Sequence, residues 1–132
     1  MKKPSKYQLT SIRYLVAFVM LLVTCFCFAQ AQLKFEDAKQ NFGFVKKGAQ
    51  VKLIYAFTNA GNEPLLITDA KAECSCTKVN FPKEPILAGK QGVIEVLFDT
   101  SPTYDRQDRT VAIISNDPKS PYKIRFKGVV LK

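Results

Sequence analysis

Short segments in which apolar and polar residues alternate constrain the fold of this chain more than any other feature. In the clearest segment, residues 122–130, the even positions from 124 onward are apolar or glycine. The positions between them carry basic residues, Lys123, Arg125 and Lys127. A period of two residues is typical of a β-strand with one buried face. Weaker alternation predicts further strands in residues 51–58, 94–98 and 111–113, and no segment after residue 32 shows helical spacing over three turns.

Turn-forming residues separate these segments at regular intervals. Glycine adopts positive φ at little cost, Asn and Asp side chains bond their own backbone, and proline ends a strand ladder. The residues expected to build these turns are Asn59, Gly61, Gly89, Asn116, Asp117 and Pro118. About seven strands joined in this way predict an all-β fold, an antiparallel β-sandwich of immunoglobulin-like type.

The first 31 residues have the features of a secretory signal peptide. Basic residues precede an apolar run, residues 14–28, and Ala29-Gln30-Ala31 supplies small residues before a cleavage site. The run is shorter than the ~20 apolar residues that span a bilayer. We therefore expect export to the periplasm or beyond, with residues 32–132 forming one domain and no membrane span after cleavage.

A lipid anchor is the alternative fate of this leader. Leu22 to Cys25 resembles the site at which bacterial lipoproteins are modified, but Thr24 stands where Gly, Ala or Ser is usual. The apolar run also continues past Cys25 to Phe28. Lipidation of Cys25 is therefore not expected.

Composition excludes several classes of function. The chain contains no histidine, so Ser-His-Asp and Cys-His hydrolase sites are excluded. The predicted domain carries 16 basic and 11 acidic residues, a net charge of +5, which favours acidic neighbours. The basic residues are scattered along the sequence, and nucleic acid is not an expected partner. We expect an envelope protein or peptide as partner and a monomer or weak homodimer.

Two cysteines one residue apart, Cys74 and Cys76, carry the main candidate chemistry. If the strand that begins near Leu65 continued unbroken, both would share a face with Ala70 and Ala72 and pack as small apolar residues. A disulfide between them is the second interpretation. Cα atoms two residues apart on a flat strand are ~6.6 Å apart, so ring closure needs a local bend. Such a strained bond in an oxidising compartment would be easily reduced, which is typical of a redox element.

Metal binding is the third interpretation of this pair. Thiolates at this spacing suit Cu(I) or half of a tetrahedral zinc site. The predicted domain has no histidine or methionine to complete such a site. Carboxylates such as Glu73 or Glu84, or a second copy of the chain, would have to do so. We therefore expect no resident metal or other cofactor, with Cys74 and Cys76 as redox or disulfide candidates.

Four segments together carry a family resemblance: FTNAGNEPLLI, CSCT, EPILAGKQGVIEVLFDT and ISNDPKSPYKIRFKGVV. In order and spacing they resemble the DUF1573 family, small exported bacterial domains of undetermined function. The chain is similar more loosely to the ASPM–SPD-2–Hydin and major-sperm-protein domains. It departs from the family pattern at Ser75, at Ala88 and in residues 104–108, where the family has glycine, proline and a glycine-bearing turn. The resemblance implies the immunoglobulin-like fold and no activity.

These observations predict a non-catalytic immunoglobulin-like module that is exported and binds or scaffolds other proteins in the cell envelope. The alternative is a thiol redox or metal-handling protein that acts through the Cys-Ser-Cys motif.

Overall fold

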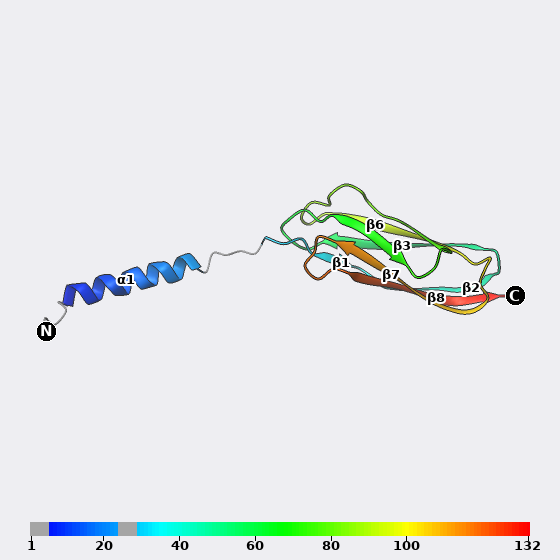
Figure 1. Ribbon diagram of the computed structural model, residues 1–132, viewed down its shortest axis with the longest axis horizontal. Coiled ribbons are helices and arrows are strands. Elements are labelled where there is room, and N and C mark those ends of the chain that lie inside the picture. Colours follow the sequence, from blue (N-terminus) through cyan, green and yellow to red (C-terminus); the bar gives the residue numbers. More distant parts are fainter. Residues whose placement is uncertain (1–5, 24–28) are drawn as a thin grey trace.

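The computed structural model describes residues 6–23 and 29–132 (Figure 1). One helix, α1 (Lys6–Val23), lies within the predicted leader. Eight strands follow it: β1 (Leu33–Phe35), β2 (Lys39–Lys46), β3 (Gln50–Asn59), β4 (Ile67–Ala72), β5 (Thr77–Asn80), β6 (Gln91–Asp99), β7 (Asp105–Ser115) and β8 (Tyr122–Leu131). In the described part of the chain, no helix is both long and apolar enough to cross a membrane. Cys25 and the end of the predicted apolar run lie outside the described residues.

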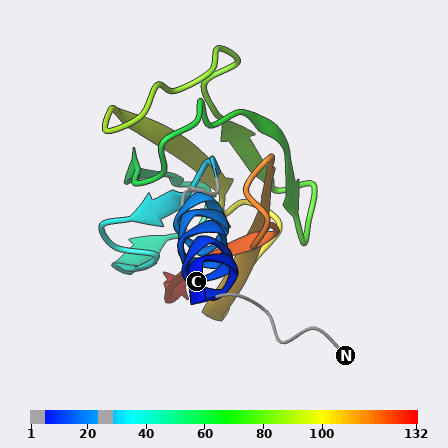
Figure 2. The same ribbon diagram turned by 90° about the vertical axis from the view of Figure 1, so that its left-hand side faces the viewer.

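The strands form two four-stranded sheets, which Figures 1 and 2 show from the side and from one end. Sheet A has the order β1-β3-β6-β5, and sheet B has the order β2-β8-β7-β4. The predicted all-β sandwich is confirmed, with eight strands where about seven were expected. One pairing differs from the antiparallel prediction, because β2 runs parallel to β8. The chain passes from sheet A to sheet B directly after β1, without reversing in a hairpin.

The core lies between the two sheets and is built from the alternating apolar residues. The buried side chains come from both inner faces, and among the largest are Tyr55, Phe57, Phe98 and Phe126. Phe98 of sheet A and Phe126 of sheet B have ring centroids 5.3 Å apart, so the two sheets meet through aromatic contacts. Such tilted aromatic pairs contribute about 0.5–1.5 kcal/mol beyond their buried area.

Backbone conformation explains how the chain tolerates one departure from the family pattern. Asp105, which begins β7, has a φ of +65°. This left-handed conformation favours glycine, and aspartate is one of the few other residues that adopt it readily. Within residues 104–108, where the family pattern has a glycine-bearing turn, Asp105 thus adopts a conformation that glycine favours.

Candidate functional site

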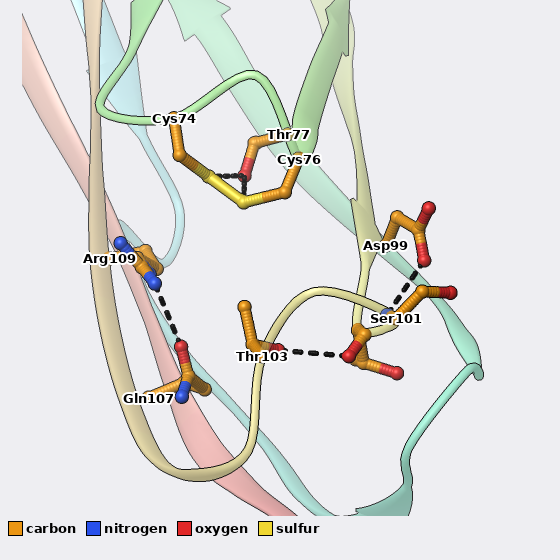
Figure 3. Close-up of a disulfide and its surroundings, with 9 residues drawn as sticks. Cys74, Cys76, Thr77, Asp99, Ser101, Thr103, Gln107 and Arg109 are labelled. Atoms are coloured by element: carbon orange, nitrogen blue, oxygen red, sulfur yellow. Dashed lines mark hydrogen bonds between the residues drawn. A yellow bond between two sulfur atoms is a disulfide. The ribbon is translucent and has the colours of Figure 1, made fainter.

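The two cysteines lie in the turn that carries the chain from sheet B to sheet A. β4 ends at Ala72 and β5 begins at Thr77, so the expectation of one unbroken strand through the motif is wrong. Because the chain bends here, the Cα atoms of Cys74 and Cys76 are 5.2 Å apart, and a disulfide joins the two residues (Figure 3). The shared strand face on which the packing interpretation depended does not form, and the turn supplies the local bend that the disulfide interpretation required.

This disulfide closes a very small loop. The chain-entropy model gives a three-residue loop a stabilisation of about 1.6 kcal/mol, against about 3 kcal/mol for a loop of 15 residues. Cys74 and Cys76 are both half-buried, and only Cys76 packs against the hydrophobic core. The bond is therefore a weak staple that remains partly accessible to solvent.

Thr77 ties the turn to the end of the sandwich. Its backbone N–H donates to the Cys74 carbonyl at 3.2 Å, and its hydroxyl lies 3.5 Å from the Cys74 Sγ and 4.0 Å from the Cys76 Sγ. The Cys76 carbonyl accepts from the backbone N–H of Asp99 at 2.8 Å. One buried hydroxyl thus faces both sulfur atoms, and the backbone on the Cys76 side is held by β6.

A cation lies on the inner face of β7 at the same end of the molecule. Val111 pairs with Ala72, the last residue of β4, and Arg109 is the next inward-facing residue along β7. Figure 3 draws Arg109 and its partner Gln107 among the surroundings of the disulfide. The half-buried Arg109 donates from Nη2 to Oε1 of Gln107 at 3.0 Å. In the described structure its guanidinium has no carboxylate within ion-pair distance.

The predicted turn residues gather at the opposite end. Asn59 is fully buried and satisfies its amide completely: Oδ1 accepts from Gln32 and Gly61, and Nδ2 donates to the carbonyls of Glu63 and Ile86. Gly89 follows in the neighbouring turn with a φ of +74°. The hydrogen bonds of Asn59 join neighbouring loops at this end of the sandwich, which is a structural role.

Asn116, Asp117 and Pro118 form the second half of this end. The amide of Asn116 accepts from the Leu66 N–H at 2.9 Å and donates to the Pro64 carbonyl at 3.0 Å. The carboxylate of Asp117, 4% exposed, accepts from the backbone N–H of Leu33. Pro118 lines a cavity of 420 Å³ beside these residues.

The segment before β1 is paired with the loop after β3. The Gln30 N–H donates to Oδ1 of Asn62 at 2.8 Å, and the Gln30 carbonyl accepts from the Asn62 N–H at 3.0 Å. Ala31 is 4% exposed and belongs to the core. Gly61 is required by this contact, since a Cβ there would lie 2.1 Å from the Gln30 carbonyl oxygen.

Six basic residues gather on the outer face of sheet B, and a seventh, Lys46, lies apart from them opposite Leu131 at the end of β2. Cross-strand register places them together, with Lys39 of β2 opposite Arg125 of β8. Ile124 and Phe126 are fully buried, so the basic residues that alternate with them face solvent. We call this surface the basic face, and its basic residues are Lys39, Lys71, Arg106, Lys123, Arg125 and Lys127. Sequence reasoning treated the basic residues as scattered, although the alternation in residues 122–130 was a signal for this surface.

Three acidic residues, Asp69, Glu73 and Asp108, lie on the same side of the sheet. Asp108 pairs with Arg125, whose Nε lies 2.6 Å from Oδ1, and this hydrogen bonding holds the pKa of Asp108 below its usual range. A groove of 280 Å³ between β2, β8 and β7 runs beside this pair. The remaining five basic residues have no ion-pair partner in the described structure.

The outer face of sheet A differs in character. Lys52 and Glu95 form an ion pair of 2.6 Å there, and basic and acidic residues nearly balance. Ile54 and Val93 are 43% and 53% exposed on the same face. In the described part of the chain, no group of three or more His, Cys, Asp or Glu side chains is arranged to hold a metal ion.

Comparison with known families fixes the relationship that the motifs suggested. Residues 33–130 match the family model described as a protein of unknown function, DUF1573. The chain belongs to the DUF1573 family. No curated protein sequence matches this DUF1573 chain.

Solved structures support the same fold for the DUF1573 domain. A protein of unknown function from Porphyromonas gingivalis W83 is similar, with a TM-score of 0.68, 18% identity and coverage of 80% of this chain and 50% of the other. The ASH/PapD-like domain 7 of human CEP192 has a TM-score of 0.64 at 6% identity, over 79% of this chain and 88% of that domain. VesB protease of Vibrio cholerae has a TM-score of 0.56 at 15% identity, over 78% of this chain and 32% of the protease. The DUF1573 chain thus spans half the length of the P. gingivalis protein, and likenesses at such identities establish the fold alone.

Proposed function

We propose that this DUF1573 chain is an exported, non-catalytic immunoglobulin-like module that binds an acidic surface of another protein in the cell envelope. The observation that carries the proposal is the basic face, where six basic residues stand against three acidic ones on one side of a rigid sheet. Export is supported by the features of residues 1–31, and a non-catalytic role by the lack of histidine.

The distribution of charge favours sheet B as the binding surface. Clustered like charges on a folded domain destabilise it through mutual repulsion, and an acidic partner relieves that repulsion. Lys123 and Lys127 flank the only ion pair of the face, Arg125–Asp108, and neither has an acidic partner in the described structure. The outer face of sheet A has no comparable excess of charge.

The groove on the basic face suits an acidic side chain. The residues that line it are Lys39, Gln40, Asn41, Arg106, Asp108, Arg125 and Lys127, and Asp108 is already paired with Arg125. A carboxylate that enters the groove would meet the three other cations, which lie on strands β2, β7 and β8 and have no ion-pair partner in the described structure. Charge-assisted hydrogen bonds of this kind are about twice as strong as those between neutral groups.

Photo-crosslinking in intact cells tests this proposal. A photoreactive amino acid is placed at Lys127 on the basic face, and in a matched variant at Lys34 on the outer face of sheet A. We expect Lys127 to capture one protein that Lys34 does not capture. The charge-reversal variant K39E/K123E should lose this adduct, and the matched variant K52E/K78E on sheet A should keep it.

The purified pair gives the quantitative test. Binding should weaken steeply as the salt concentration of the assay is raised from about 50 to about 300 mM. Over this range the Debye length falls below about 10 Å, so attraction between charged surfaces is screened. Equal capture from both faces, capture that K39E/K123E does not alter, or an adduct that contains only phospholipid would each overturn the proposed protein partner.

A further inference from the structure

We propose that the Cys74–Cys76 disulfide is a thiol–disulfide exchange site, in which an external protein dithiol attacks Cys74 and Cys76 leaves as the thiolate. This activity is separate from the proposed binding by the basic face, which lies on the outer side of sheet B. The proposal depends on how accessible each sulfur atom is to a thiol in solution, and on the side chains that face the two sulfur atoms.

The two cysteines differ in how the fold holds them. Cys76 packs against the hydrophobic core, and its carbonyl is bonded to the backbone of β6 through Asp99. Cys74 comes first in the turn and is half-buried without being part of that packing. An incoming thiolate therefore reaches the Cys74 Sγ from solvent, whereas the Cys76 Sγ is the inner atom and the natural leaving group.

The environment of the sulfur atoms favours a thiolate. The Thr77 hydroxyl lies 3.5 and 4.0 Å from the two Sγ atoms, and it can donate to a thiolate when the bond opens. Arg109 points between the sheets at the same end, and its only hydrogen bond in the described structure is to the neutral amide of Gln107. A half-buried cation without an anionic partner is unfavourable, and a thiolate would supply that partner.

Other charged groups near the turn do not supply such a partner. Glu73 and Lys78 are exposed on either side of the motif. Asp99 accepts a hydrogen bond from the Ser101 N–H at 2.9 Å, and this bond lowers the pKa of Asp99. Arg109 is thus the charged residue on the inner face of β7 that follows the point where β4 ends and the disulfide turn begins.

The proposed reaction balances with a protein dithiol as the reductant. A thiolate of the dithiol forms a bond to the Cys74 Sγ, the Cys74–Cys76 bond breaks, and its electron pair remains on the Cys76 Sγ. The second thiolate of the dithiol then attacks the dithiol's first sulfur, which is bonded to Cys74 in the mixed disulfide, and Cys74 leaves as a thiolate. The dithiol loses two electrons and two protons to become a disulfide, and the module gains them as two thiols.

The first experiment determines which sulfur is attacked. The purified, oxidised mature protein is mixed with reduced glutathione as a monothiol probe, the reaction is quenched with acid, and the mixed disulfide is located by peptide mapping. We expect glutathione on Cys74. Glutathione on Cys76, or no reaction of the folded protein under conditions that modify the unfolded chain, would overturn the proposal.

The second experiment measures the effect of Arg109 with a matched control. Removing a neighbouring cation raises a thiol pKa by about one unit, which slows exchange about threefold if leaving groups respond as attacking thiols do. R109Q should therefore be reduced by dithiothreitol about threefold more slowly than the wild type. K34Q, which removes one positive charge from the outer face of sheet A, should react at the wild-type rate.

Two further readouts separate exchange from a structural role. In the reduced protein, the ultraviolet absorbance of the thiolate should titrate at higher pH in R109Q than in K34Q. T77V should also slow reduction while the protein keeps its fold. Equal rates and equal titrations in R109Q and K34Q would show that Arg109 does not act on the cysteines. Unchanged partner binding by the double variant C74S/C76S would show that the exchange site and the basic face are independent.

Discussion

Asp117 connects three parts of the chain, and replacing it gives a sharp test of the fold. Its Oδ2 accepts hydrogen bonds from the Leu33 N–H at 2.7 Å and from the Tyr122 hydroxyl at 2.6 Å. Its Oδ1 accepts from the Lys119 N–H at 2.8 Å. The carboxylate thereby joins β1, the turn after β7 and the start of β8.

The expected loss of unfolding free energy follows from the hydrogen-bonding groups that each substitution leaves without a partner. D117N keeps an acceptor for Lys119, but the Nδ2 that replaces Oδ2 is a donor and can accept from neither Leu33 nor Tyr122. The Leu33 N–H is buried, and an unsatisfied buried donor costs about 1–3 kcal/mol. We therefore expect D117N to lose about 2 kcal/mol of unfolding free energy, and D117A about 3–4 kcal/mol because it loses all three bonds.

Urea and thermal denaturation of the mature domain measure these losses. For a domain of this size, about 2 kcal/mol corresponds to a fall in Tm of roughly 8–16 °C. Y122F is the control, because it removes one of the three bonds and leaves the carboxylate bound to Leu33. If D117N and Y122F both unfold within about 0.5 kcal/mol of the wild type, Asp117 does not stabilise the fold as described.

The same residue gives a pH dependence of defined sign. Burial raises the pKa of Asp117, but hydrogen bonds from Tyr122, Lys119 and Leu33 outweigh it and hold the pKa below the usual value. A lowered folded-state pKa contributes stability that is present above the unfolded pKa of about 3.9 and is lost as pH falls through the folded pKa. D117N should therefore lose less stability than the wild type when the pH is lowered through this range. Parallel curves for the two proteins would contradict the assignment.

Two further predictions concern Gly92 and Tyr122. A Cβ at Gly92 would lie 2.5 Å from the ring of the fully buried Phe57, so G92A should lower the unfolding free energy by about 1–3 kcal/mol in urea denaturation. G89A, where no atom lies within 4 Å but φ is +74°, should cost only about 1 kcal/mol, and the reverse order would contradict this reasoning. Burial, with the hydrogen bond and charge of Asp117, raises the pKa of Tyr122 to about 12, and ultraviolet titration should show that pKa falling in D117N but not in D108N.

Much of this fold could be predicted from the sequence because its strands are half-buried. The alternation in residues 122–130 reflects one face against the core and one in water, and it identified β8 together with the direction of its side chains. The parallel pairing of β2 with β8 was not predictable in this way, since alternation shows which residues are inward but not which strand is the neighbour. The three residues of β1 are too few to establish a period, so alternation alone does not predict this strand.

The candidate sites were harder to predict from the sequence than the strands, because they are formed by residues that only the tertiary structure brings together. Parity placed Cys74 and Cys76 on one face only if the strand continued, and nothing local to the motif indicates that the chain changes sheets there. Arg109 shares the parity of the buried Val111 and Ile113, so alternation alone places it on the inner face of β7. Its closeness to the end of β4 could not be predicted, because that depends on the pairing of Val111 with Ala72.

The burial of Ala31 has a consequence for the order of events in the life of this protein. The bond after Ala31, at which the leader is predicted to be cut, lies between residues that hydrogen-bond to the loop after β3. A protease needs an extended, accessible segment, and here Ala31 is buried and both its neighbours are hydrogen-bonded to the fold, with only the flanking side chains exposed. If the leader is cut at the predicted bond, we expect cleavage to come before folding, and a precursor that folds first to keep its leader. Variants that fold faster should then accumulate as unprocessed chains.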